Sequence, residues 1–245
     1  MKKIVTTFII VAIVVATTMY HNKQQSSAPT ISDISLISVD GSLRHDAMAT
    51  LIAPYKAQKD SAMNIIVGQA TETMEVAKPE SSLTRLIADV LLAEARKVDP
   101  EVHMAVTNIG GIRRPLFQGN ITIGDVYEIL PFDNSLLILE YKGETIIELA
   151  NAIATKGGES ISGIKLDIHD GKASNILINN QPINPERIYK VVTTDYLSWG
   201  NDQLAPLANH IQSTPLNLMM RDAMLNYLND HNIVLAPKDN RIFSK

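Results

Sequence analysis

Three loops of this 245-residue chain carry side chains that could recognise a polar, partly aromatic small molecule. The first loop, Asn108-Ile-Gly-Gly-Ile-Arg113, follows a short apolar run. Gly110 and Gly111 allow a sharp turn and let a ligand approach the backbone closely. Asn108 offers both a hydrogen-bond donor and an acceptor, and Arg113 offers a planar fork of donors. This pattern favours a site for a polar, partly anionic ligand; the alternative is a plain turn with exposed arginines.

The second and third loops add aromatic rings. Phe132 follows a proline and precedes two polar residues, so its ring either stands exposed or closes a helix in the core. The third loop, from Asp195 to Gln203, contains Tyr196, Trp199 and Asp202. Its rings could stack on a base, and its aspartate could accept hydrogen bonds from sugar hydroxyls. A buried tryptophan in a structured loop is the alternative.

The sequence does not indicate a hydrolytic metal centre. Asp167 and His169 have the Asp-x-His spacing of a metallophosphoesterase, but they fall in a predicted hairpin without companion motifs. A two-metal site needs several clustered ligands. The chain has no cysteine and no Gly-x-Ser-x-Gly elbow. We therefore predict no metal site and no catalytic residue in this chain. Residues 167–170 are predicted to form a solvated hairpin tip.

The composition restricts the possible partners. The chain has 22 Lys+Arg against 26 Asp+Glu, a formal net charge of −4, which argues against a protein that grips DNA or RNA backbones. Apolar residues make up 45% and charged residues 20%, as in ordinary globular domains, which excludes a disordered or polytopic membrane chain.

The N-terminus reads as a targeting segment. Lys2 and Lys3 precede an apolar stretch from residue 4 to about residue 19. This run is short for a membrane span of ~20 residues, so a cleaved signal peptide is favoured over an uncleaved anchor. We predict a signal peptide or anchor at 1–20, a polar linker at 21–32 and one domain at 33–245. The expected location is the periplasm or cell envelope of a bacterium, with membrane contact only through an uncleaved N-terminal segment.

The elements that must position the three loops alternate between helices and strands. A helix is predicted over 82–97, because Leu83, Leu86, Ile87, Val90 and Leu91 recur at helical spacing. Strands over 102–107 and 188–193 lead into the first and third loops. A helix opened by the capping box at Thr122 leads to the second loop.

Further elements complete the prediction. Helices are expected at 46–58 and 144–154, a strand at 136–141, and a hairpin that joins 164–168 to 176–178 through Asp170-Gly171. The strongest helix is expected to begin at Thr214 as N-cap with Pro215 in its first position. Irregular interleaving of strands, helices and hairpins favours an α+β fold, a single domain of mixed or antiparallel sheets with packed helices.

Taken together, the loops resemble the C-terminal, substrate-recognising domain of the 5′-nucleotidase family. The resemblance runs from about residue 47 to residue 240. Its motifs stand in the family's order: Glu80-Ser-Ser-Leu-Thr-Arg-Leu-Ile-Ala-Asp89, Thr107-Asn-Ile-Gly-Gly-Ile-Arg113, Gly119-Asn-Ile-Thr-Ile-Gly-Asp-Val-Tyr127, Leu130-Pro-Phe-Asp-Asn134, Ile161-Ser-Gly-Ile164 and Thr194-Asp-Tyr-Leu-Ser-Trp-Gly-Asn-Asp202.

The resemblance implies a role for each site residue. Phe132 and Tyr196 would sandwich the base, and Asn108 would contact the base edge. Arg113 would contact sugar or phosphate, and Asp202 would bind the ribose hydroxyls.

The sequence also departs from the family's pattern. Pro79 stands where many relatives have an arginine, and Thr84-Arg85 stands where they have Gly-Asn. In the third loop (195–203), called the late loop below, Asn201 and Gln203 replace two glycines of the family pattern. This makes the late loop bulkier and could shift Asp202, which lies between them.

Family enzymes carry a separate N-terminal metallophosphoesterase domain, and only about 30 residues precede the domain in this sequence. The resemblance therefore implies the nucleotide- or nucleoside-recognising component of an exported phosphohydrolase system for nucleotide catabolism. The chain would have no cofactor and no catalysis of its own; a separately encoded metallophosphoesterase would supply the divalent metal pair. The alternative is a free-standing nucleoside or nucleotide binder, or a degenerate interaction domain without catalysis.

Overall fold

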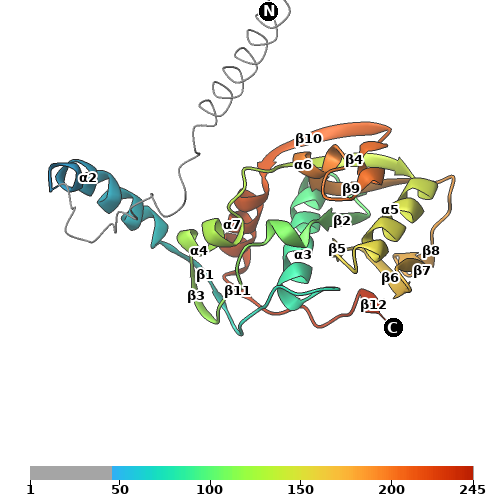
Figure 1. The fold of residues 1–245 in the computed structure, drawn as a ribbon, viewed down its shortest axis with the longest axis horizontal. Helices are drawn as coiled ribbons and strands as arrows, with labels where there is room; N and C mark the ends of the chain where they lie inside the picture. Colours follow the sequence, from blue (N-terminus) through green and yellow to red (C-terminus); the bar gives the residue numbers. More distant parts are fainter. Residues whose placement is uncertain (1–45, 245) are drawn as a thin grey trace, which may run out of the picture. The chain divides into compact units, whose positions relative to one another are not determined.

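The computed structural model describes residues 46–244, so the predicted signal or anchor (1–20), the linker (21–32) and residues 33–45 lie outside the described residues. The elements follow one another along the chain as helices, strands and two 3-10 turns (Figure 1): α2 (Asp46–Met63), β1 (Ile66–Ala70), α3 (Ser82–Val98), β2 (Met104–Thr107), η2 (Ile109–Gly111), β3 (Gly119–Thr122), α4 (Ile123–Ile129), β4 (Ser135–Lys142), α5 (Gly143–Thr155), β5 (Ser160–Ser162), β6 (Ile164–His169), β7 (Lys172–Ile178), β8 (Gln181–Pro182), β9 (Ile188–Thr194), α6 (Asp195–Ser198), η3 (Ala205–Ala208), β10 (Gln212–Met219), α7 (Met220–His231), β11 (Ile233–Val234) and β12 (Ile242–Ser244).

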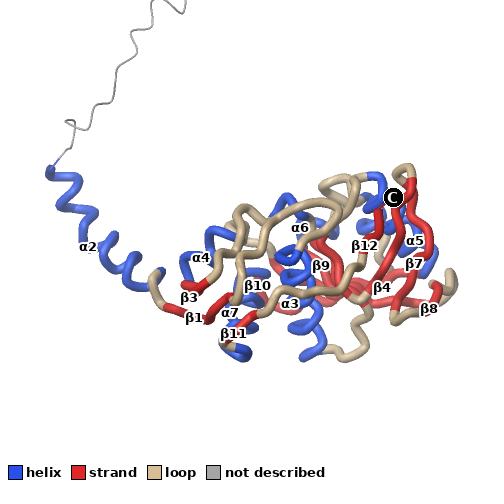
Figure 2. Tube along the Cα trace, turned by 90° about the horizontal axis from the view of Figure 1, so that it is seen from below, coloured by secondary structure: helices blue, strands red, loops and turns tan. Residues whose placement is uncertain are grey.

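A central five-stranded sheet organises the domain, in the order β10-β4-β9-β2-β5. Strand β9 runs parallel to β2 and antiparallel to β4, so the sheet is mixed. Two smaller sheets, β11-β1-β3 and β12-β6-β7-β8, lie at opposite ends of the domain (Figure 2). Mixed sheets with packed helices confirm the predicted α+β fold.

The two faces of the central sheet bury separate hydrophobic clusters. Along β2, Ala105 faces the cluster formed with α3, α4 and α7, whereas its neighbours Met104 and Val106 face the cluster around α5. Strand β9 divides Val191 and Val192 between the two faces in the same way. Since side chains alternate along a strand, a continuous apolar run is what a sheet covered on both faces requires.

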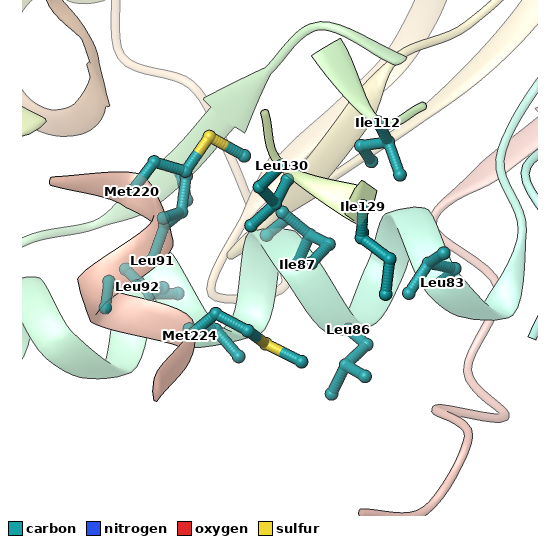
Figure 3. Packing of buried hydrophobic residues seen from close by; sticks show 14 of the residues in the cluster. Leu83, Leu86, Ile87, Leu91, Leu92, Ile112, Ile129, Leu130, Met220 and Met224 are labelled. Atoms are coloured by element: carbon teal, nitrogen blue, oxygen red, sulfur yellow. The ribbon is translucent and has the colours of Figure 1, made fainter. Parts of the chain in front are cut away.

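Helix α3 forms for the reason its sequence predicts. Its apolar stripe, with Leu83, Leu86, Ile87 and Leu91, packs on α7 and α4 in the first cluster (Figure 3). Ser81 caps its N-terminus: the serine hydroxyl accepts from the Thr84 N–H, and the Thr84 hydroxyl accepts from the Ser81 N–H. This capping box satisfies two backbone donors that would otherwise lack partners.

Replacing Ser81 with alanine is expected to lower the free energy of unfolding by about 1 kcal/mol, because the Thr84 N–H loses its acceptor. Urea denaturation followed by circular dichroism measures this loss. Ser174→Ala, at an exposed position of β7, is the matched control. A loss no larger than that of the control would mean that the cap contributes nothing.

The helix predicted to begin at Thr214 is a correction. Residues 212–219 instead form strand β10, in which Thr214 pairs with Ile138 and Pro215 with Leu137 of β4. Thr-Pro is a local helix-start signal, but β10 is the edge strand of the sheet, where a missing N–H is tolerated. The helix α7 begins only at Met220, and its buried apolar side chains are Met220, Ala223, Met224 and Leu228.

The other elements that were predicted match the structure within a few residues, whereas several short strands, among them β1, β8, β11 and β12, were not predicted. The hairpin turn at Asp170-Gly171 has φ values of 49° and 71°, as a two-residue type I′ turn requires. His169 and Asp170 side chains are 72% and 91% exposed, which confirms the solvated tip. Within residues 46–244, no helix combines the length and apolarity that crossing a membrane demands.

Candidate functional site

The three loops meet at one edge of the central sheet because of strand direction. Strands β2 and β9 are parallel, so Asn108 and Asp195 follow the same ends of neighbouring strands. Strand β4 is antiparallel to β9 and pairs Leu136 with Thr194, so the loop that contains Phe132 enters the sheet at that edge too. Segments far apart in the sequence thus converge on one place.

A cavity of about 350 Å³ opens between these loops. Six of the seven predicted binding residues line it, and Asn134, which the sequence analysis did not single out, joins them. The lining consists of Asn108, Gly110, Gly111, Phe132, Asn134, Tyr196 and Asp202. Arg113 is outside this lining.

The aromatic rings are accessible. Phe132 is 48% exposed and Tyr196 is 45% exposed, so neither ring is part of the core. The alternative that Phe132 closes a helix in the core is therefore wrong. Trp199 is 80% exposed and does not line the cavity, so the alternative of a buried tryptophan is wrong as well.

One carboxylate oxygen ties the two aromatic loops together. Asp195 Oδ1 accepts from the Ser135 N–H at 3.2 Å, next to the Phe132 loop, and from the Tyr196 N–H at 2.7 Å. The backbone next to Phe132 and the backbone of Tyr196 are therefore held by the same acceptor, Asp195 Oδ1.

Arg221, at the start of α7, holds the Phe132 loop from its other side. Its guanidinium donates to the Leu130 carbonyl at 3.2 Å and to Asp133 Oδ1 at 2.5 Å. It lies 4.1 Å from the Tyr127 ring centroid, a cation–π contact. The Arg221 residue is only 7% exposed, so the loop is anchored to a rigid, buried group.

Two arginines of the family motifs make contacts within the protein: Arg85, which departs from the family pattern, and Arg113, which matches it. Arg85 donates to the Pro237 carbonyl at 3.0 Å and pairs with Glu80, so it is committed elsewhere and does not line the cavity. Arg113 donates to the Gly110 carbonyl at 3.1 Å, where it braces the glycine loop from outside the lining. Its contact with a ligand stays a prediction.

Asp202 is the charged residue of the lining, and Lys156 lies against it. The Lys156 ammonium is 3.2 Å from Asp202 Oδ2 and pairs with Glu159 as well. Glu159 is 1% exposed, and burial raises the pKa of its carboxyl, while Lys156 and the Ile109 N–H oppose the rise.

Sequence reasoning missed three residues that build this site, Lys156, Glu159 and Arg221, and it gave no role to Asn134, which belongs to the motif at 130–134. Arg221 carried a detectable signal, because a charge within the apolar stripe of a helix must find partners when buried. Lys156 and Glu159 flank the Gly157-Gly158 turn, and only the sheet pairing shows that this turn lies at the site.

The arrangement suits recognition of a flat ring with polar edges and attached hydroxyls. Accessible aromatic faces can stack on a base, the asparagines and the glycine backbone can bond its edges, and a carboxylate accepts from hydroxyls. Among residues 46–244, no cluster of three or more His, Cys, Asp or Glu residues is arranged to hold a metal ion.

Comparison with known proteins identifies relatives. The family model "5'-nucleotidase, C-terminal domain" matches residues 66–210. A 5′-nucleotidase of Vibrio parahaemolyticus is 25% identical over 195 residues, which cover 76% of this chain and 34% of that protein. An NAD 5′-nucleotidase of Haemophilus influenzae is 30% identical over 207 residues, which cover 71% of this chain and 33% of that protein.

A solved structure has the same fold. The 5′-nucleotidase precursor from Thermus thermophilus superposes with a TM-score of 0.71 at 24% identity, over 81% of this chain and 43% of that one. The chain spans about a third of the length of the curated relatives it matches.

Proposed function

This chain belongs to the family of the 5′-nucleotidase C-terminal domain, and from that premise we propose that it recognises nucleosides or nucleotides for a phosphohydrolase. The observation that carries the proposal is the cavity in which Phe132 and Tyr196 stand beside Asn108 and Asp202. Stacking on aromatic rings tolerates many bases, so the site would hold a nucleoside without a sharp preference for one base.

Four lining residues, together with Arg113, have a part in this proposal. Phe132 and Tyr196 stack on the base, and Asn108 bonds its edge through donor and acceptor groups. Asp202 accepts hydrogen bonds from the ribose hydroxyls, which fixes the sugar and hence the direction of the 5′ substituent. Arg113, at the outer side of the glycine loop, would contact the sugar or the phosphate.

We propose that hydrolysis takes place on a metallophosphoesterase partner that is encoded separately. Its divalent metal pair would activate water and hold the phosphate. The support is that the chain spans about a third of the curated relatives' length. The chain's own residues bind the nucleoside and orient the phosphate ester toward that partner.

We propose an exported protein of the bacterial envelope. The support is the basic start at Lys2 and Lys3 followed by an apolar run.

A free-standing nucleoside binder is the second candidate. The observation in its favour is that none of the seven described lining residues carries a positive charge, so the cavity itself complements a neutral nucleoside.

Titration of adenosine and AMP into the full chain tests the proposal. Saturable heat with a dissociation constant of about 1 mM is expected for a recognition site that lacks its partner. A mixture of this chain and a metallophosphoesterase from the same genome should then release phosphate from AMP faster than the metallophosphoesterase alone.

The outcomes separate the candidates. Adenosine binding with no effect on phosphate release would favour the free-standing binder. Absence of heat, together with no stimulation of phosphate release, would contradict a role in nucleotide recognition.

A further inference from the structure

A fourth segment reaches the same edge of the central sheet. Strand β5 pairs antiparallel with β2, with Ser160 opposite Thr107, so the turn before β5 lies beside the glycine loop. This turn carries Lys156, the C-cap of α5, and Glu159. Both side chains are nearly inaccessible, at 8% and 2% exposed.

Lys156 makes three polar contacts at this place. Its ammonium group donates a hydrogen bond to the Asp202 carbonyl at 2.6 Å. It also forms ion pairs with Glu159 Oε1 and, at 3.2 Å, with Asp202 Oδ2. One lysine thus fixes both the backbone and the side chain of the aspartate that lines the cavity.

Glu159 extends this contact to the glycine loop. Its Oε2 accepts from the Ile109 N–H at 2.6 Å, at the start of the glycine loop that follows Asn108. The chain of contacts therefore runs from Ile109 through Glu159 and Lys156 to Asp202.

The late loop needs such a restraint. Asp202 and Gln203 have φ values of 55° and 60°, in the left-handed region that non-glycine residues seldom occupy. A backbone of this kind persists only where its surroundings hold it. Lys156 bonds the Asp202 carbonyl directly, so it acts on the strained residue itself.

We propose that Lys156 and Glu159 are a positioning pair that sets Asp202 against the glycine loop, so that the site selects ligands with ribose hydroxyls. The inference rests on the proposed nucleoside recognition and adds the residues that determine sugar selectivity. Neither residue is in the described lining of the cavity; they act through Asp202 and Ile109.

Two ligands and one variant test the pair. Adenosine and 2′,3′-dideoxyadenosine share a base and differ in the hydroxyls. The wild-type chain is expected to bind adenosine more tightly, about tenfold. Lys156→Met should remove this difference by weakening adenosine alone, while binding of 2′,3′-dideoxyadenosine stays within twofold.

Trp199, the single tryptophan of the chain, gives a readout that does not depend on a ligand. It lies in the late loop, three residues before Asp202. The heteronuclear NOE of its indole and of the amides of 201–204 should fall in Lys156→Met, which reports a loosened loop.

Lys190→Met is the matched control. Lys190 also bonds two carboxylates, Asp99 and Glu101, each at 2.8 Å. Neither of these carboxylates lines this cavity, whereas Asp202 does. The control should leave both ligand affinities and the Trp199 signal unchanged. If Lys156→Met fails to unfold cooperatively, Lys156→Gln, which keeps one donor group, takes its place in the same measurements.

The proposal and its premise fail in different ways. If the wild-type chain binds neither ligand, nucleoside recognition by this chain alone is wrong, and the order of residues 201–204 in the Lys156 variant still decides whether the pair positions Asp202. Equal weakening of both ligands, retained preference for adenosine, or an unchanged late loop would each overturn the positioning role.

Discussion

Phe132→Ala is expected to weaken adenosine binding by between about fivefold and about 150-fold. Stacking of one base on an aromatic ring contributes roughly 1–3 kcal/mol, and each 1.4 kcal/mol is about a factor of ten. The Phe132 ring is 48% exposed and lines the cavity, so a base can reach its face. Calorimetric titration of adenosine into the variant and the wild-type chain measures the change.

The variant should keep its loop in place. Arg221 holds this loop through the Leu130 carbonyl and Asp133, and Asp195 holds it through the Ser135 N–H. None of these contacts uses the phenylalanine ring, so an affinity loss reports stacking rather than collapse.

Phe117→Ala is the matched control for Phe132→Ala. Phe117 is 54% exposed and its ring lies 5.2 Å from the Arg114 guanidinium carbon, outside the cavity lining. Its loss should leave adenosine binding unchanged. Equal losses in both variants, or full affinity in Phe132→Ala, would move the base site away from this cavity.

Six of the seven residues that line the cavity could be selected from the sequence because they lie in short segments next to strand or helix ends. Asn108, Phe132 and Tyr196 each follow or precede a strand or helix with a clear local pattern. Local sequence patterns predict where each strand ends, but they do not predict which strands pair. That these loops converge therefore follows only from the sheet order β4-β9-β2.

The residues that sequence reasoning missed act over long separations. Lys156 meets Asp202 46 positions later, and Arg221 meets Asp133 88 positions earlier. The sequence around a charged residue does not show which distant residue it meets, so these contacts follow only from tertiary structure. The same holds for Arg85, whose guanidinium is taken by the carbonyl of Pro237.

The error at Thr214 has a related cause. Thr-Pro opens helices in isolation, but strand β10 pairs with β4 from Gln212 to Pro215, and again at Met219 after an irregularity, when it stays extended. Leu216 and Leu218 pack on the first core cluster from that strand. Tertiary pairing therefore outweighs a local start signal, which contributes only about 1 kcal/mol.

Arg241→Met is expected to lower the free energy of unfolding by about 3 kcal/mol. The Arg241 residue is 5% exposed and donates to Asp239 at 2.8 Å, to Asp89 at 2.7 Å and to the Ile161 carbonyl at 2.7 Å. Removal of one partner from a buried pair costs about 3–5 kcal/mol. Asp239 and Asp89 both reach solvent and can rehydrate, so the lower end of that range applies.

Arg187→Met is the control for Arg241→Met, because Arg187 is exposed and its side chain contacts only the ring nitrogen of His103 and the Tyr189 ring among the described residues. A change within about 0.5 kcal/mol is expected there. Urea denaturation at neutral pH compares both variants with the wild-type chain.

Acid titration gives the Arg241 prediction a second test. The hydrogen bond from Arg241 lowers the pKa of the Asp239 carboxyl. A depressed folded-state pKa contributes stability above the ordinary aspartate range, and that contribution is lost as the pH falls through the depressed value. The difference in the free energy of unfolding between the wild-type chain and Arg241→Met should therefore become smaller at acid pH. If the difference in unfolding free energy is the same at neutral and at acid pH, the loss comes from the Ile161 hydrogen bond and from packing. The ion pairs of Arg241 would then not contribute to holding the C-terminal strand β12.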